Sequence, residues 1–357
     1  MTEDEATTVS AILHPLLRAL EMLAFVARHL HPPHLAELLD SIGRPDDALK
    51  AVSATQLPWP DSLSAIKKPI EEASEAALQA FTGLRQDTGD RADVRRALRL
   101  LPKALATLYP LASVLSPVNL FFLDPALRSS SEVPDQFLGT PAFDNTGVVQ
   151  FDGENGERGG FWLYVPENYT PDRAWPVVMA LHGGSGTGRL FLWSWLRDAR
   201  SHGAILVAPT SIGSTWALMG EDADTPNLAR ILAFVRSKWN IDGYRLLLTG
   251  MSDGGTFTYV SGLEAESPFT HLAPVAAAFH PMLARLANAD RIRGLPMHII
   301  HGALDWMFPV ELARQAQRTF TNAGAKVAYR EIEDLSHTYP SDVNLLLLSW
   351  LATTNRR

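Results

Sequence analysis

A serine set among glycines is the part of this sequence best suited to covalent chemistry. Residues 250–255 read GMSDGG, which contains the pattern G-x-S-x-G, with an apolar run at 246–248 before it and a helix-like segment at 256–260 after it. Glycines at these places let a strand turn sharply into a helix, and the turn exposes the serine hydroxyl above the helix N-terminus. The pattern predicts that Ser252 is a nucleophile, although the same pattern also occurs in turns that only join a strand to a helix.

A serine hydroxyl needs two partners before it attacks at neutral pH. An imidazole must take its proton, and a carboxylate must orient that imidazole and stabilise its charged form. After Ser252 the chain offers Asp305, just beyond the apolar run 297–300, and His337, just beyond the β-rich run 327–332. The order Ser, Asp, His is one of those found in serine hydrolases. We therefore expect Asp305 as the acid and His337 as the base.

Other titratable residues fit these roles less well. His280 precedes every plausible acid, so we interpret it as a loop residue that lines the pocket wall. His301 stands at a strand end, where it would order the loop that carries Asp305. Asp334 shares a loop with His337 and is expected to face solvent.

Acyl transfer also needs backbone N–H donors for the oxyanion of the transition state. One donor is expected from Asp253, the residue after the nucleophile, and the other from the loop LHGGSGTG at 181–188. Gly184 is the preferred second donor and Gly183 the alternative. The same loop fails as a phosphate-binding loop, because Arg189-Leu190 stands where Lys-Ser or Lys-Thr is required. It also fails as a dinucleotide-binding fingerprint, because the third glycine is missing.

Aromatic residues near the expected site suggest a pocket. Trp216 and Trp306 each follow a strand on a loop, so both are expected to contact substrate. Trp193 and Trp195 are interpreted as helix packing residues. Two roles are possible for the carboxylate of Asp253. It places a negative charge near the pocket, or it stabilises the N-terminus of the following helix as an early acidic residue.

The region from about residue 126 alternates β-rich runs with helical ones, which predicts a mostly parallel sheet. The expected strands are 147–151, 161–165, 177–181, 204–208, 245–249, 275–278, 297–300 and 327–332. Helices are expected to begin near residues 190, 225, 254, 310 and 341. This order predicts an eight-stranded α/β sheet with an antiparallel strand or two at its start.

Residues 1–125 form a separate helical region in this prediction, because apolar residues recur at steps of three and four between proline-rich breaks. Its role stays open between a lid, a scaffold and an oligomerisation surface, and a homo-oligomer is one expected state. The side chains at 121–123 are expected to pack between domains or to cover the pocket entrance. His29, His31 and His34 do not predict a metal site, since Pro32-Pro33 breaks the helical spacing that would align them.

Composition limits the classes of function. The formal charge of −8 argues against binding to nucleic acid or to an anionic membrane, and the chain has no cysteine. The N-terminus is acidic where a secretory signal would be basic, and ionisable residues interrupt the apolar stretch 11–30. We therefore expect no membrane span and, if the printed N-terminus is the native one, a cytoplasmic protein.

Taken together, residues 161–351 resemble the phospholipase/carboxylesterase group of α/β-hydrolases and the related polyhydroxybutyrate depolymerases and feruloyl esterase-like enzymes. The resemblance rests on LHGG with TG at 181–188, GxSxGG at 250–255, HGxxD with Pro309 at 301–309, and Ser336-His337. It implies hydrolysis of carboxylic esters or thioesters of small molecules without a metal or cofactor. The secreted members carry a signal and disulfides, whereas this chain has no cysteine and we expect no signal. Two alternatives are a serine peptidase of the oligopeptidase type, against which the helical N-terminal half argues, and a non-catalytic binding protein on the same fold.

Overall fold

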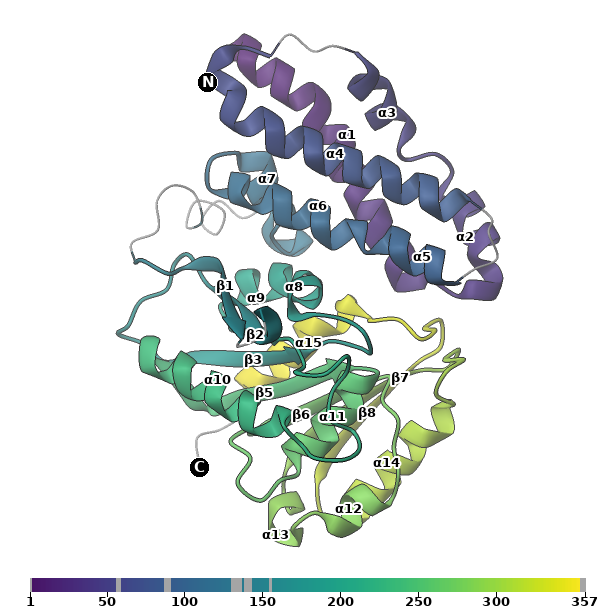
Figure 1. The fold of residues 1–357 in the computed structure, drawn as a ribbon, viewed down its shortest axis with the longest axis vertical. Coiled ribbons are helices and arrows are strands. Elements are labelled where there is room, and N and C mark those ends of the chain that lie inside the picture. The colour runs from purple at the N-terminus through teal and green to yellow at the C-terminus, as the bar shows by residue number, and fades with distance from the viewer. Residues whose placement is uncertain are drawn as a thin grey trace. The chain divides into compact units, whose positions relative to one another are not determined.

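The chain folds into two compact units, residues 1–140 and 141–357 (Figure 1). The computed structural model describes residues 2–353 except 56–58, 87–90, 130–136, 138–142 and 154–155. The division falls at Thr140, later in the chain than the boundary at 125/126 that we expected from the sequence. Most of the polar stretch around that boundary lies outside the described residues.

The first unit is helical throughout its described residues. Its helices are α1 (Glu3–His29), α2 (Leu35–Ile42), α3 (Asp47–Ala54), α4 (Ser64–Arg85), α5 (Arg91–Leu98), α6 (Leu100–Leu108) and α7 (Ser116–Phe121). A capping box starts α1, in which the Thr2 side chain and the Glu5 side chain each bind the backbone N–H of the other residue. The buried face of α1 repeats at helical spacing, and α1 packs against α3 and α4.

By length and composition alone, α1 could cross a membrane, and it is the one helix of that kind among the described residues. The buried share of its most apolar stretch is 44%. A core helix of a helical unit passes the same test, so this observation is weak evidence for a span.

The second unit is built on an eight-stranded sheet in the order β1-β2-β4-β3-β5-β6-β7-β8. The strands are β1 (Gly147–Gly153), β2 (Gly156–Val165), β3 (Trp175–Leu181), β4 (Ile205–Pro209), β5 (Ile241–Met251), β6 (His271–Val275), β7 (Pro296–Gly302) and β8 (Lys326–Ile332). β2 pairs antiparallel with both β1 and β4, and every later pair is parallel. This is the α/β-hydrolase sheet that the sequence predicted.

Helices cover both faces of this sheet (Figure 1). They are α8 (Gly188–Phe191), α9 (Leu196–His202), α10 (Asp224–Lys238), α11 (Asp253–Gly262), α12 (Met282–Leu286), α13 (Ala289–Ile292), α14 (Val310–Asn322) and α15 (Asn344–Ala352). In Figure 1, α8, α9 and α15 lie on one face, while α10, α11 and α14 lie on the other. The central strands β3 and β5 are buried along most of their length, as expected of parallel strands covered on both faces. Trp195 is fully buried and Trp193 nearly so, in agreement with the packing role expected for both.

The sixth strand differs from the prediction. We expected residues 275–278, but β6 runs from His271 to Val275. Pro274 lies inside the strand, where proline is rare because it cannot donate a ladder hydrogen bond. Ala276 has a φ of 45°, outside the range of extended backbone, so the strand cannot continue past Val275.

Candidate active site

The turn between β5 and α11 holds Ser252 in a constrained conformation. Ser252 has φ 57° and ψ −119°, and its amide donates to the Val275 carbonyl at 2.9 Å. A Cβ at Gly250 would lie 2.5 Å from the backbone of Gly254, and one at Gly254 would lie 2.5 Å from the Leu181 and His182 carbonyl oxygens. Only glycine fits these two positions. The structure therefore gives a physical reason for the glycines of the G-x-S-x-G pattern.

Three side chains from three loops meet at this turn. His337 Nε2 lies 3.0 Å from Ser252 Oγ, and His337 Nδ1 lies 2.8 Å from Asp305 Oδ2. Asp305 follows β7 and His337 follows β8, so both lie at the carboxyl edge of the sheet where β5 delivers Ser252. All three side chains are largely buried. The serine–imidazole–carboxylate chain expected from the sequence is thus complete in geometry.

The loop after β7 fixes the carboxylate of Asp305. Its Oδ1 accepts hydrogen bonds from the amides of Met307 at 2.9 Å and Phe308 at 2.8 Å, which leaves Oδ2 for His337. Burial alone would raise the pKa of the Asp305 carboxyl, but hydrogen bonds from His337 and Phe308 and the charge of His337 lower it below its ordinary value. Asp305 therefore stays ionised at neutral pH and holds the proton of the imidazole on Nδ1.

His301 supports this loop from beneath. Its Nε2 lies 2.9 Å from the Phe308 carbonyl and 3.4 Å from Asp305 Oδ2. Burial, the largest influence, lowers the pKa of His301 in spite of the nearby carboxylate. A neutral ring with its proton on Nε2 donates to the carbonyl and pins the loop, which is the ordering role expected for it.

The loop after β3 is held by the buried ring of His182. The Ser211 amide donates to His182 Nε2 at 3.1 Å, so the ring proton is on Nδ1, which donates to the Gly183 carbonyl at 2.7 Å. Burial lowers the pKa of His182 to about 4, so the ring is neutral. The Gly183 carbonyl also accepts from the Gly186 amide at 3.0 Å.

This arrangement orients the Gly184 amide. In a trans peptide the C=O of one residue and the N–H of the next point in opposite directions. The Gly183 carbonyl is committed to His182 and Gly186, so the Gly184 N–H points away from them. A Cβ built at Gly183 would lie 3.6 Å from Ser252 Cβ, which places this peptide beside the nucleophile. The Asp253 amide is the other expected donor. It lies in the first turn of α11, where backbone N–H groups have no carbonyl partner within the helix.

Trp216 lies behind this loop rather than on the pocket surface. It is 2% exposed, its indole N–H donates to the His182 carbonyl at 2.7 Å, and its ring stacks on Phe257. The substrate contact expected for Trp216 does not fit this burial, and we propose a supporting role in its place. Trp306, in contrast, is 41% exposed, with its ring centroid 6.2 Å from that of His337.

Sequence reasoning missed Thr215, on the loop after β4, and Asp224, at the start of α10. Thr215 Oγ1 donates to Asp253 Oδ2 at 2.6 Å, which ties this loop to the turn that carries Ser252. Asp224 accepts from the amides of Ile212 and Ala217, at 2.8 and 2.9 Å. Neither residue belongs to a short motif, so only the folded loop reveals its role.

The other candidates lie apart from the triad contacts. His280 is exposed, and its Nδ1 accepts from the Met282 amide at 3.2 Å. Asp334 is exposed, as expected. His34 contacts Glu37 in the helical unit, and the described residues contain no group of three or more side chains suited to hold a metal ion.

Comparison with known proteins points to ester hydrolases. No protein-family model matches the chain. It is 29% identical over 169 residues to a bifunctional acetylxylan esterase/xylanase of Neocallimastix patriciarum (44% of this chain, 23% of that protein). It is 27% identical over 140 residues to acetylxylan esterase A of Emericella nidulans (36% and 45%) and 25% identical over 152 residues to feruloyl esterase B of Neurospora crassa (38% and 50%). The matches span between about a quarter and half of the length of these relatives.

Among solved structures, a thermostable esterase aligns with a TM-score of 0.48 and 23% identity, over 60% of this chain and 64% of that one. The strand order and the nucleophile turn of the chain itself define the fold. It is the α/β-hydrolase fold. The sequence relatives are named as esterases.

Proposed function

We propose that this protein is a serine carboxylesterase that works through an acyl-enzyme on Ser252. One observation carries the proposal: His337 bridges Ser252 Oγ and Asp305 Oδ2 with hydrogen-bond distances of 3.0 and 2.8 Å. The exposed alternative His280 instead accepts a hydrogen bond from the Met282 amide through Nδ1.

The reaction follows from this arrangement. His337 Nε2 takes the hydroxyl proton while Ser252 Oγ attacks the ester carbonyl, and the resulting oxyanion accepts from the amides of Gly184 and Asp253. Collapse of this intermediate expels the alcohol, which takes its proton from His337. Water then attacks the acyl-enzyme with His337 as base, and the acid is released. Asp305 stabilises the imidazolium in both halves of the reaction.

For the substrate class, we propose esters with a small or aromatic acyl group. The first support is that the sequence relatives are named as acetylxylan esterases and a feruloyl esterase. The second support is the surface beside His337, where Trp306 and Met307 are 41% and 44% exposed. Exposed apolar side chains at a catalytic edge suit the binding of a flat or short hydrocarbon group.

A substrate screen tests this proposal. Purified protein and Ser252→Ala are assayed with p-nitrophenyl esters of graded acyl length, with a feruloyl ester and with an aryl-amide peptide. We expect turnover of short-chain or feruloyl esters by the native chain and none above background by Ser252→Ala. Cleavage of the amide without the esters would replace the esterase proposal with a peptidase, and equal turnover by both proteins would remove Ser252 from the mechanism.

A further inference from the structure

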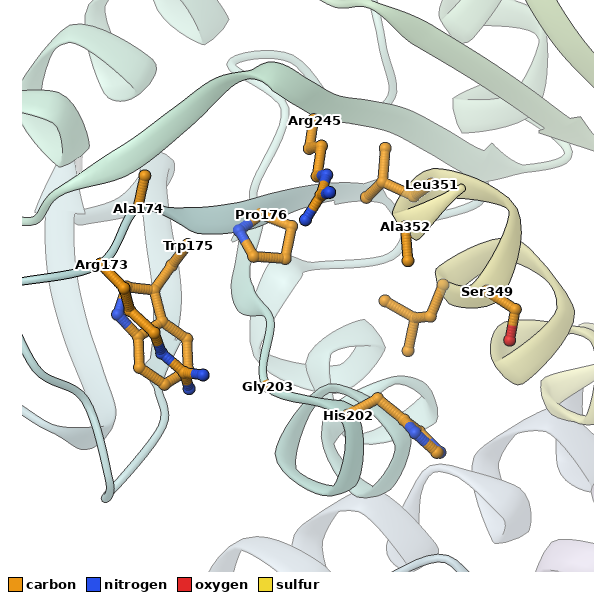
Figure 2. A pocket seen from close by; sticks show the side chains of 11 residues that line it. Arg173, Ala174, Trp175, Pro176, His202, Gly203, Arg245, Ser349, Leu351 and Ala352 are labelled. Carbon is orange, nitrogen blue, oxygen red and sulfur yellow. The ribbon is translucent and has the colours of Figure 1, made fainter. Parts of the chain in front are cut away.

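A cavity in the second unit lies far from the triad. Its volume is about 390 Å³, and it opens where β3 begins at Trp175-Pro176, next to Arg245 on β5. The end of α9 and the last turns of α15 form its other walls (Figure 2). Arg245 precedes Ser252 by seven positions on the same strand and turn, which separates them by about 20 Å at the usual strand rise. The cavity is therefore distinct from the site of the triad.

Two arginines give this cavity a positive charge. Its polar lining consists of Arg173, Arg245, His202 and Ser349, and no acidic side chain is among its described lining residues. The Arg173 guanidinium stacks on Trp175, 3.6 Å from the ring centroid, and within the described part of the chain it has no ion pair. Such a stacked, exposed guanidinium keeps its N–H donors available for an anion.

Arg245 is also incompletely satisfied. Its Nε is buried and has no hydrogen-bond partner. Arg245 forms an ion pair with Asp242, whose Oδ2 lies 3.8 Å from Nε, beyond hydrogen-bond distance. The Arg245 side chain as a whole is 31% exposed, so its terminal N–H groups, and not the covered Nε, are the donors that an acceptor in the cavity can reach. In Figure 2 the guanidinium of Arg245 points into the cavity beside Pro176.

The rest of the wall is hydrocarbon, supplied by Pro176 and by Leu348, Leu351 and Ala352 of α15. A bare inorganic anion would leave this wall uncovered. We propose that the cavity binds a small organic carboxylate, whose head group pairs with Arg245, whose charge is also attracted by Arg173, and whose hydrocarbon body lies against α15. The volume is within the range of small-molecule sites. This inference does not depend on the esterase proposal.

Calorimetric titration tests it, with benzoate as the probe and benzamide as its neutral match. Arg245→Gln and Arg173→Gln are compared with Arg236→Gln, an exposed arginine of α10 outside the cavity. We expect one saturable benzoate site that each cavity variant weakens about fivefold or more, binding unchanged in Arg236→Gln, and much weaker binding of benzamide. Because Arg173 is exposed, Arg173→Gln decides the question if Arg245→Gln does not fold.

Inhibition kinetics distinguish binding of benzoate in this cavity from binding of benzoate near Ser252. The inhibition constant of benzoate against p-nitrophenyl acetate hydrolysis should be the same in all three variants. The proposal is overturned by an absence of saturable binding up to about 10 mM benzoate. It is also overturned by equal affinity for benzamide, or by equal losses in the cavity variants and in Arg236→Gln.

Discussion

At the scale of residues, the reactive side chains of the site are held in place by hydrogen bonds from neighbouring residues. Two amides and one imidazole fix the carboxylate of Asp305. Ser252, Asp305 and His337 were all predictable from the sequence, because each follows a readable strand and their order matches the chemistry. Thr215 was not predictable, since its role depends on a 2.6 Å contact between loops that lie far apart in the chain.

Replacing Asp305 by Asn should lower kcat by about a thousandfold or more, because an amide supplies no charge to stabilise the imidazolium and its NH₂ favours the wrong tautomer. Initial rates with p-nitrophenyl acetate measure this. Asp334→Asn, an exposed change near His337, is the matched control and should retain native rates. A kcat for Asp305→Asn within tenfold of the native value would mean that another group is the acid.

The charge of Asp253 should discriminate between substrates. A Cβ at Gly184 would lie 2.7 Å from Asp253 Oδ2, so this carboxylate borders the loop that is expected to bind the oxyanion. A second negative charge on the acyl group would be repelled. Asp253→Asn keeps an acceptor for Thr215 and removes the charge.

We therefore expect Asp253→Asn to raise kcat/KM for the p-nitrophenyl monoester of succinic acid about tenfold relative to p-nitrophenyl butyrate. High salt should reduce the difference. An equal change for both esters would show that the charge of Asp253 does not reach the acyl group.

At the scale of elements, the loops after β3 and β4 act as one support. His182 binds the Ser211 amide, and Trp216 binds the His182 carbonyl, so each loop holds the other. The glycines of the first loop were readable from the sequence. The burial of Trp216 was not, because an aromatic residue on a loop can face either way until the packing of Phe257 is known.

Trp216→Phe removes the indole N–H and keeps an aromatic ring. We expect about 1 kcal/mol of lost stability, the usual value of one hydrogen bond, and a fall in kcat of roughly tenfold because the oxyanion loop loses its anchor. Trp239→Phe, a buried change at the end of α10, should affect stability without lowering kcat. Unfolding curves and kcat values of both variants check this, and an equal loss of kcat in the two would contradict it.

At the scale of the whole molecule, the second unit buries four histidines, His182, His271, His298 and His301. Burial is the largest influence on each and lowers its pKa, to about 4 for His182 and His271. The number of strands and most strand positions followed from the alternating sequence pattern, whereas the order of the strands in the sheet comes from the structure. β6 did not, because Pro274 hides a central strand and only pairing with β5 and β7 reveals it.

These histidines make stability depend on pH. Below pH 6.5 the unfolded chain binds protons that the folded chain refuses, so the unfolding free energy should fall as the pH drops from 6.5 toward 4. His182 and His271 each contribute at most about 3 kcal/mol to this loss. Asp224, whose pKa burial raises, acts in the opposite direction. Urea unfolding between pH 7 and 4.5 measures the slope, and His271→Asn should flatten it. A stability that is constant or rises over this range would contradict the account.

The central claim is that Ser252 carries the acyl group. Rapid acid quench of the protein with p-nitrophenyl acetate, followed by mass spectrometry of proteolytic peptides, tests it most directly. We predict one acetyl group on the peptide that contains Ser252, formed before steady-state turnover and absent from Ser252→Ala. Ester turnover without that adduct, or an adduct on another residue at a competent rate, would contradict the account.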